Sequence, residues 1–473
     1  AGVCICIHCQ LRSISVDISQ PPTKQRIADP SLARPPACLL SFFLSPRLTL
    51  LRHLPSAATK NKALCQQNVN SHMPRKTQQP QSSTMPSPTS VVVVSDPRNA
   101  HMSPLNLLRK KSQQHYQHQH QYPAKVWKCQ ASCKSKRALN PIRAIVDALV
   151  DDVKMGYQRE DRKDPISLAL GDPTVSSKLK PCKAAVDAVM RAVGSANHAA
   201  SYVNASGTPE ARIAVANYHS YHEHIIGPEN VVITNGCSGA LELALNTLLD
   251  PGSTVLVPQP GFPLYQMIAE AHGASVCHYP LLSDQNWECD FDHMESIMAS
   301  TKDVRAIIIN NPSNPTGAVF SECHLKRIIN FAFKHRLPIL SDEVYGDITF
   351  APNKFHPIAQ VAARMGRQVP IITASGLAKQ FLVPGWRAGW LAFHDNIYGS
   401  LNDIQLGVQR LAQIQLGASH LAQAAIPVLL SPSTPGVAEW KHELKETLER
   451  QCMFLCNMLS HCEGLEVIPA QGA

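Results

Sequence analysis

Acidic residues are almost absent from the first 135 residues of this 473-residue chain. That stretch holds only three, Asp17, Asp29 and Asp96, against 17 Lys and Arg, and it contains no Glu. The rest of the chain carries 27 bases and 32 acids, so the net positive charge belongs to the N-terminal stretch alone. A main body of mildly negative charge gives no indication of nucleic-acid binding.

Long apolar runs and paired metal-binding cysteine motifs are also missing. The apolar run 39–51 is broken by Pro46 and Arg47 and is too short to span a bilayer. The 15 cysteines do not form two CxxC motifs in zinc-site spacing, and a chain of this length does not need a disulfide framework. We therefore expect no membrane span, no metal site, and reduced thiols in a cytoplasmic protein.

The composition of residues 1–135 predicts a disordered, basic, low-complexity extension. The stretch is rich in Pro, Ser, Gln and His and lacks sustained amphipathic periodicity. Its His/Gln run, 115–120, is more typical of a solvated tract than of a metal site. The Arg- and Ser-rich composition is also that of a transit peptide, which leaves a mitochondrial location open. The first Met is Met73, so translated upstream sequence is a further alternative.

From about Lys136 onward, short apolar runs alternate with helix-like segments. This alternation predicts an α/β fold, a three-layer αβα domain with a mainly parallel sheet. Ligands of such sheets bind beyond the carboxyl ends of the strands, which is where the polar motifs of this chain fall. The expected strands are 231–234, 254–257, 306–310, 338–341, 370–373 and 390–393, and the expected helices include 239–249, 263–271, 322–334 and 437–459.

A lysine motif follows one of these strands. The segment SGLAK, 375–379, ends in Lys379 at the rim of the predicted sheet. A lowered pKa there would make the amine a nucleophile toward an aldehyde. Arg387, eight residues further on, would supply a bidentate clamp for a phosphate. An isolated Lys is usually a surface residue, so this interpretation depends on the motifs that accompany it.

Three polar motifs accompany it at the ends of other predicted strands. Asp342 and Tyr345 follow an apolar run, where Asp would equally serve as a helix N-cap. Asn314 lies in NNPSNPTG, 310–317, a composition that is also typical of a simple turn. The segment TNGCSGALE, 234–242, leads from a strand into a helix whose N-terminus would bind a phosphate.

Together these motifs resemble those of the class I/II aminotransferases, the fold type I family that uses pyridoxal 5′-phosphate (PLP). The resemblance covers roughly residues 136–473. It implies that Lys379 binds PLP as an internal aldimine and then moves the substrate proton. It also implies that Asp342 pairs with the pyridine nitrogen of PLP and Tyr345 with its phenolic oxygen. Asn314 would contact that oxygen and the substrate carboxylate, and Arg387 the phosphate.

The resemblance also assigns roles that the residues alone do not indicate. Phe262 matches the residue that stacks on the PLP ring, although a buried core Phe is its ordinary interpretation. Tyr202 matches a tyrosine that reaches the phosphate of the neighbouring subunit, which implies a homodimer with shared active sites. For the phosphate, the resemblance implies the amides of Gly236 and Cys237 and the hydroxyl of Ser238, with Cys237 a packing residue rather than a nucleophile.

Two further segments narrow the resemblance to the tyrosine aminotransferase branch of the family. NPIRAIV, 140–146, and ISLALGDPTV, 166–175, are similar to that branch rather than to the aspartate branch, and Gly171 is an implied substrate-binding residue. Gly376 stands where the aspartate branch has a phosphate-binding Ser. The implied activity is a ping-pong transamination of an aromatic L-amino acid, tyrosine first, with a 2-oxo acid such as 2-oxoglutarate.

The resemblance further implies a division into domains. After the extension come an arm with the N-terminal part of a small α+β domain, 136–184, a large PLP-binding domain, 185–440, and a partial small domain, 441–473. The chain ends before the arginine that clamps the substrate carboxylate in the family, so we expect a fragment with impaired substrate binding. A PLP-dependent C–S or β-lyase of the same fold and a non-catalytic PLP-binding fragment are the alternative functions.

Overall fold

The computed structural model describes residues 130–140, 171, 174, 179–195, 200–395 and 399–473. Its centre is an eight-stranded sheet with the order β1-β8-β7-β6-β5-β2-β3-β4. From β1 to β3 every strand except β8 runs in the same direction, and β4 pairs antiparallel with β3 at the edge. The strands are β1 Val231–Asn235, β2 Thr254–Gln259, β3 Ser275–Leu282, β4 Glu288–Cys289, β5 Val304–Asn310, β6 Ile339–Asp342, β7 Ile371–Gly376 and β8 Ala388–His394.

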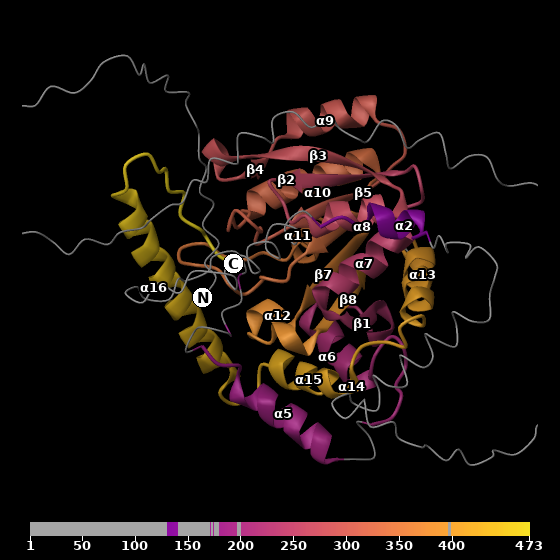
Figure 1. Cartoon of the computed structure of the whole chain (residues 1–473), viewed down its shortest axis with the longest axis vertical. Helices are drawn as coiled ribbons and strands as arrows, with labels where there is room; N and C mark the ends of the chain where they lie inside the picture. The colour runs from indigo at the N-terminus through magenta and orange to yellow at the C-terminus, as the bar shows by residue number, and fades with distance from the viewer. Residues whose placement is uncertain (1–129, 141–170, 172–173, 175–178, 196–199, 396–398) are drawn as a thin grey trace, which may run out of the picture. The chain divides into compact units, whose positions relative to one another are not determined.

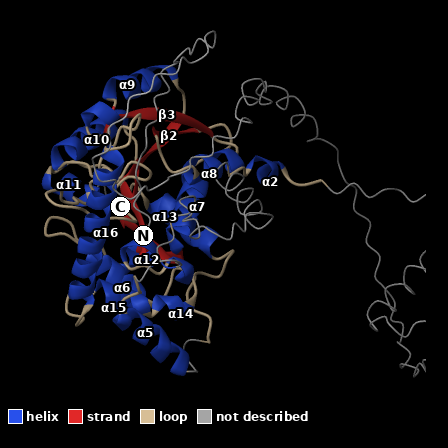
Figure 2. Ribbon diagram, turned by 60° about the vertical axis from the view of Figure 1, so that its left-hand side comes forward, coloured by secondary structure: helices blue, strands red, loops and turns tan. Residues whose placement is uncertain are grey.

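Helices cover both faces of this sheet and complete the three layers (Figure 1). Figure 2 shows the strands enclosed between helices that come from distant parts of the chain. One face is covered by α7 Gly236–Leu248, α8 Leu264–His272 and α13 Asn402–Ala412. The other face is covered by α9 Phe291–Ser300, α10 Glu322–His335 and α11 Ile358–Arg364, and further along by α5 Lys183–Gly194, α6 Pro209–Tyr218, α14 His420–Gln423 and α15 Ala425–Leu430.

The strands hold both helical layers because successive side chains point to opposite faces of a sheet. In β5, Ile308 packs on the side of α7, whereas Ile307 and Ile309 pack on the side of α10. All three are fully buried, and burying each such side chain contributes about 1.5–3 kcal/mol. This two-sided burial explains why residues 306–309 of the strand are consecutive apolar residues in the sequence.

Local sequence signals determine where the helices begin. The side chains of Thr208, Asp290 and Ser321 cap α6, α9 and α10, because each accepts a hydrogen bond from a backbone N–H three residues on. Such a cap stabilises a helix by about 1 kcal/mol. In α7, by contrast, the N-cap residue Asn235 makes no side-chain cap bond. The backbone N–H groups at the start of α7 are therefore left for another partner.

One edge of the sheet collects the carboxyl ends of the parallel strands. β1 ends there at Asn235, β5 at Asn310, β6 at Asp342 and β7 at Gly376. Asn310 lies opposite Asp342 in the ladder, and Gly389 at the start of β8 lies opposite Gly376. The strand ends that precede the polar motifs therefore meet at one edge, as the sequence predicts.

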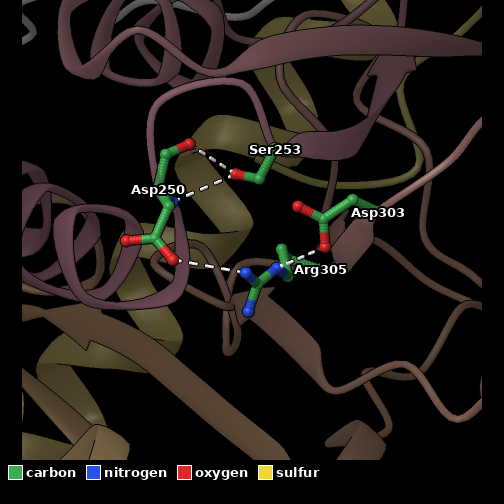
Figure 3. Close-up of polar contacts among 4 residues, drawn as sticks. All are labelled: Asp250, Ser253, Asp303 and Arg305. Carbon is green, nitrogen blue, oxygen red and sulfur yellow. Dashed lines mark hydrogen bonds and ion pairs between the residues drawn. The ribbon is translucent and has the colours of Figure 1, made fainter.

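At the opposite ends of the strands, exposed polar contacts link the starts of β2 and β5 (Figure 3). Arg305 lies between Asp303 and Asp250, with its Nε 2.7 Å from Asp303 Oδ1 and its Nη2 3.2 Å from Asp250 Oδ2. The Ser253 hydroxyl donates to the carbonyl of Asp250 over 2.7 Å and accepts from its N–H over 3.1 Å. Because these charged side chains are largely in solvent, each ion pair contributes about 0–1 kcal/mol.

The long helix α16, Val437–Ser460, runs along one side of the three layers, in yellow in Figure 1. Its residues Leu444 and Leu448 form a small core with Ile348, which follows β6. Thr349 makes an isolated bridge with Gly472. The end of the described chain thus packs on the segment that leads away from β6.

The predicted α/β fold with a mainly parallel sheet is confirmed. All six predicted strands and all four predicted helices are present, with ends shifted by at most three residues, whereas β3 and β4 were not predicted. The predicted extension lies outside the described residues apart from 130–135, where α2 Cys133–Arg137 begins, and so does the His/Gln run 115–120. Among the helices described, none is long and apolar enough to cross a membrane.

Candidate active site

Asp342 lies at the carboxyl end of β6, and its side chain is only 3% exposed. The hydroxyl of Tyr265, from α8, donates to its Oδ2 over 2.8 Å. The backbone N–H of Val344 donates to Oδ1 over 3.2 Å, and the thiol of Cys237, from α7, donates to the same oxygen over 3.5 Å. Three donors from three parts of the fold therefore fix the orientation of this carboxylate.

Burial governs the protonation of this group. It raises the pKa of Asp342, although the bonds from Tyr265, Val344 and Cys237 and the nearby charge of Lys379 oppose the rise. Burial also raises the pKa of Tyr265 and of Cys237 well above their usual ranges, so both stay protonated and act as donors. The site thus presents a desolvated carboxylate that a cation placed against it would stabilise in the charged form.

The start of α7 forms a narrow cradle beside Arg387. Gly236 has a φ of 72°, and a Cβ atom there would lie 2.7 Å from Arg387 Nη2. A Cβ atom on Gly389 would lie 2.3 Å from the carbonyl carbon of Gly236 and 2.5 Å from the nitrogen of Cys237, so only glycine permits this approach. Arg387 Nη2 donates to the carbonyl of Asn235 over 3.1 Å. Helix N–H groups beside a guanidinium suit an anion such as phosphate.

Lys379 lies in the short helix α12, Leu377–Gln380, which follows β7 directly. Its Nζ lies 5.6 Å from the centroid of the Tyr345 ring, and both side chains are half-buried. The charge of Lys379 is also close enough to Asp342 to lower the pKa of that carboxyl. The three residues that the sequence predicts as catalytic therefore share one electrostatic environment.

Asn314 and Phe262 join this cluster through one intermediate residue each. The N–H of Asn314 donates to Asn310 Oδ1 over 2.7 Å, and Asn310 Nδ2 donates to the carbonyl of Asp342 over 3.1 Å. The Phe262 ring packs edge-on against that of Tyr265, with 5.7 Å between the centroids. Phe262 is thus linked to Asp342 through Tyr265, and Asn314 is linked to it through Asn310.

A cavity of about 630 Å³ opens beside the cradle. Its lining includes Ser238 and Arg387, which are both exposed, together with Glu242 of α7 and Lys134 of α2. Helix α2 is held over α8 by Arg137, which donates to the carbonyls of residues 270 and 271 over 2.8 and 3.0 Å. Two basic side chains, three serines and one carboxylate therefore line this cavity.

Two predicted residues stand apart from the other nine. Tyr202 is 89% exposed, and within the described residues no hydrogen bond or ring contact joins it to Arg387 or Ser238. Gly171 is also exposed, and the residues on either side of it lie outside the described ranges. Among all the residues that the structure describes, no group of three or more His, Cys, Asp and Glu residues is arranged to hold a metal ion.

Tyr265 and Asn310 both bind Asp342, although no pattern in the sequence assigns them a role. Tyr265 follows Phe262 by three residues at the start of α8, and Asn310 precedes Asn314 by four. Asn310 is the first residue of the motif 310–317, and Tyr265 lies close in sequence to Phe262, so proximity to predicted residues is the one signal that could have found them. Their contacts with Asp342 depend on which elements are neighbours in space.

The sequence model of the family described as aminotransferase class I and II matches residues 163–473. The chain belongs to this family. The tyrosine aminotransferase of Dictyostelium discoideum is 38% identical over 348 residues, which cover 73% of this chain and 80% of that protein. The tyrosine aminotransferase of Homo sapiens is 37% identical over 349 residues, which cover 73% of each. The predicted family is thereby confirmed.

Solved structures of aminotransferases also match the fold. The crystal structure of tyrosine aminotransferase from Leishmania infantum superposes with a TM-score of 0.65 at 28% identity, covering 74% of this chain and 82% of that one. Class I and II aminotransferases work with PLP, so the chain is an enzyme of a PLP-dependent family. The edge that holds Asp342 and Lys379 is its candidate active site.

Proposed function

We propose that this aminotransferase transfers the amino group of an aromatic L-amino acid, tyrosine first, to a 2-oxo acid such as 2-oxoglutarate. The observation that carries the proposal is the convergence of Lys379, Tyr345 and the buried Asp342 beside an anion cradle. The similarity to tyrosine aminotransferases supports an aromatic substrate. The PLP-dependent lyase has less support, because the relatives and the solved structure reported above are tyrosine aminotransferases.

The residues of this edge fit PLP. The buried carboxylate of Asp342 matches a protonated pyridine nitrogen, the kind of cation that its burial requires. The N-terminus of α7, free of a side-chain cap, matches the phosphate. The residues that would hold the cofactor are Lys379 at its aldehyde carbon, Tyr345 and Asn314 at its phenolic oxygen, Phe262 at its ring face, and Gly236, Cys237, Ser238 and Arg387 at its phosphate.

PLP, when bound, supplies an electron sink for the electrons that remain on the substrate Cα after its proton leaves. The Nζ of Lys379 accepts that proton as a general base and returns it as a general acid. Asp342 would hold the proton on the pyridine nitrogen, and its three hydrogen-bond donors keep the carboxylate oriented for that role. The hydroxyl of Tyr345 would donate a hydrogen bond to the phenolic oxygen and would so tune the basicity of the neighbouring lysine.

A homodimer is part of the proposal. The ring of Tyr202 is almost fully exposed, which leaves it accessible to a second chain. By resemblance it would reach the phosphate of the partner, and Gly171 would contact the substrate. Light scattering of the purified chain should then give twice the mass of one subunit, and Tyr202→Phe should weaken PLP binding.

A cytoplasmic location is also proposed. The nine cysteines of the described part of the chain are all free thiols, and four of them, Cys182, Cys237, Cys289 and Cys452, are buried. Reduced thiols are typical of the cytosol. Fractionation of cells that express the native transcript would separate this location from mitochondria.

The full chain loaded with PLP, given tyrosine and 2-oxoglutarate, provides the test of the activity. We expect glutamate and the aromatic 2-oxo acid in equal amounts, and Lys379→Ala should lower kcat about 10²- to 10⁴-fold. Lys302→Ala is the matched control, because Lys302 is exposed and precedes the start of β5, at the opposite end of that strand from the cluster. Pyruvate and ammonia from a β-substituted amino acid, without glutamate, would instead support a lyase. A cofactor absorption band without turnover would support a non-catalytic PLP-binding protein.

A further inference from the structure

Lys441, near the start of α16, contacts two residues that lie close in sequence to the candidate site. Its Nζ lies 2.6 Å from Asp347 Oδ2, and the same atom lies 4.5 Å from the centroid of the Phe381 ring. The lysine side chain is 26% exposed and that of Asp347 is 42% exposed, so solvent reaches the pair only in part. One ammonium group thus contacts an anion and an aromatic face at once.

Each of the two partners of Lys441 lies two residues after a residue of the candidate site, Tyr345 or Lys379. Asp347 follows Tyr345 by two residues in a tight turn, in which Ile348 N–H donates to the Tyr345 carbonyl over 2.8 Å. Phe381 follows Lys379 by two residues and donates its N–H to the carbonyl of Leu377, at the start of α12, over 3.1 Å. Such short hydrogen-bonded links leave little freedom between each contact and the site residue that precedes it.

Other contacts also hold Phe381 and Asp347 in place. Trp440, the residue before Lys441, stacks on the Phe381 ring with 6.3 Å between the centroids and 7° between the planes. Its indole N–H donates to the carbonyl of Lys180 over 3.1 Å. The hydroxyl of Tyr218 donates to Asp347 Oδ2 over 3.2 Å, so Asp347 is held from α6 as well as from α16.

We propose that Lys441 is a positioning residue, which fixes the segment of Tyr345 and the segment of Lys379 relative to each other. The proposal rests on the proposed function, because those two residues act together only around PLP. Lys441 does not touch the reacting atoms. It holds Asp347 by charge and Phe381 by its ring face, and both of these interactions end at the same nitrogen.

This placement predicts a spectroscopic effect. If Tyr345 moves away from the phenolic oxygen of the cofactor, that oxygen holds the proton it shares with the lysine nitrogen more tightly. The pH midpoint of the visible absorption band of the loaded enzyme should therefore rise in Lys441→Met, which keeps the apolar stem and removes the charge. We expect a rise of about half a pH unit or more and a kcat about fivefold lower, with KM changed less than twofold.

Three further variants make the test specific. Lys441→Arg keeps a cation for both Asp347 and the ring, so the midpoint and kcat should return to within about twofold of the parent. Lys445→Met lies one turn further along α16 and should leave both unchanged. Asp347→Asn should raise the midpoint as Lys441→Met does, and the double variant should be no worse than the more affected single one.

The outcomes distinguish failure of the proposed function from failure of this inference alone. A parent chain without a cofactor band would overturn the proposed function and this inference together. A parent band with an unchanged midpoint in Lys441→Met, even if the melting temperature falls, would show a purely structural ion pair and overturn this inference alone. A shifted midpoint that Lys441→Arg restores would support it, whether or not tyrosine proves to be the best substrate.

Discussion

Acid should weaken the fold through His219, which lies between α6 and β8. Its side chain is 3% exposed, and its Nε2 accepts a hydrogen bond from the indole N–H of Trp390 over 2.9 Å. Burial lowers the pKa of His219 to about 4, and the charge of Asp347 opposes this only in part. A protonated ring would also lose the Trp390 bond, because Nε2 would then carry a hydrogen.

The sign and size of the effect follow from proton linkage. The unfolded chain takes up a proton at this residue near its ordinary pKa of 6.5, and the folded chain does so only near 4. Protonation below pH 6.5 therefore favours the unfolded state, and stability falls as the pH drops until the folded pKa is reached. Between pH 7 and pH 5 this one histidine should remove about 2 kcal/mol from the free energy of unfolding.

Urea unfolding of the cofactor-free chain at pH 7 and pH 5 measures this loss in the free energy of unfolding. His219→Gln offers an amide oxygen to Trp390 and cannot titrate, so its loss of stability over this range should be smaller than that of the parent by about 2 kcal/mol. His293→Gln, on the exposed side of α9, is the control and should lose as much stability as the parent. Equal losses in His219→Gln and the parent would refute the argument.

Two further predictions concern the cofactor cradle. Tyr265→Phe removes the 2.8 Å bond to Asp342 and should raise the PLP dissociation constant about 10- to 100-fold, since a bond to a charged group contributes about 1.5–3 kcal/mol; an unchanged constant in equilibrium titration would contradict this. Gly389→Ala places a Cβ atom 2.3 Å from the backbone of Gly236, so it should displace the start of α7 and lower both PLP affinity and the melting temperature. Gly385→Ala, which has open space around it, should change neither.

The sequence predicts the sheet well where both faces of a strand are buried. Each of β5, β6 and β7 contains consecutive buried apolar residues, as in 306–309 of β5, because helices cover these strands on both sides. β3 lies near the edge of the sheet, is partly exposed, and mixes His278 and Pro280 with apolar residues. Its pattern is therefore not that of a buried strand, which explains why it was not predicted.

The candidate site is predictable in its residue types but not in its contacts. PLP chemistry requires a lysine, a carboxylate and an anion cradle, so the motifs point to Lys379, Asp342 and the start of α7. The bond between Tyr265 and Asp342 joins residues 77 positions apart, and that between Cys237 and Asp342 joins residues 105 apart. Such contacts depend on the order of strands in the sheet, which local periodicity does not encode.

The antiparallel strand β8 is what brings the lysine and the arginine to the same edge. Only 11 residues separate Gly376, at the end of β7, from Ala388, at the start of β8. A parallel crossover needs a connection of a dozen or more residues, usually with a full helix, so β8 returns antiparallel and Gly389 pairs with Gly376. Lys379, early in this connection, and Arg387, at its end, therefore both lie beside the start of α7. A longer connection with a crossover helix would deliver the following strand from the opposite edge. The length of this connection therefore determines the positions of Lys379 and Arg387 as much as its residues do.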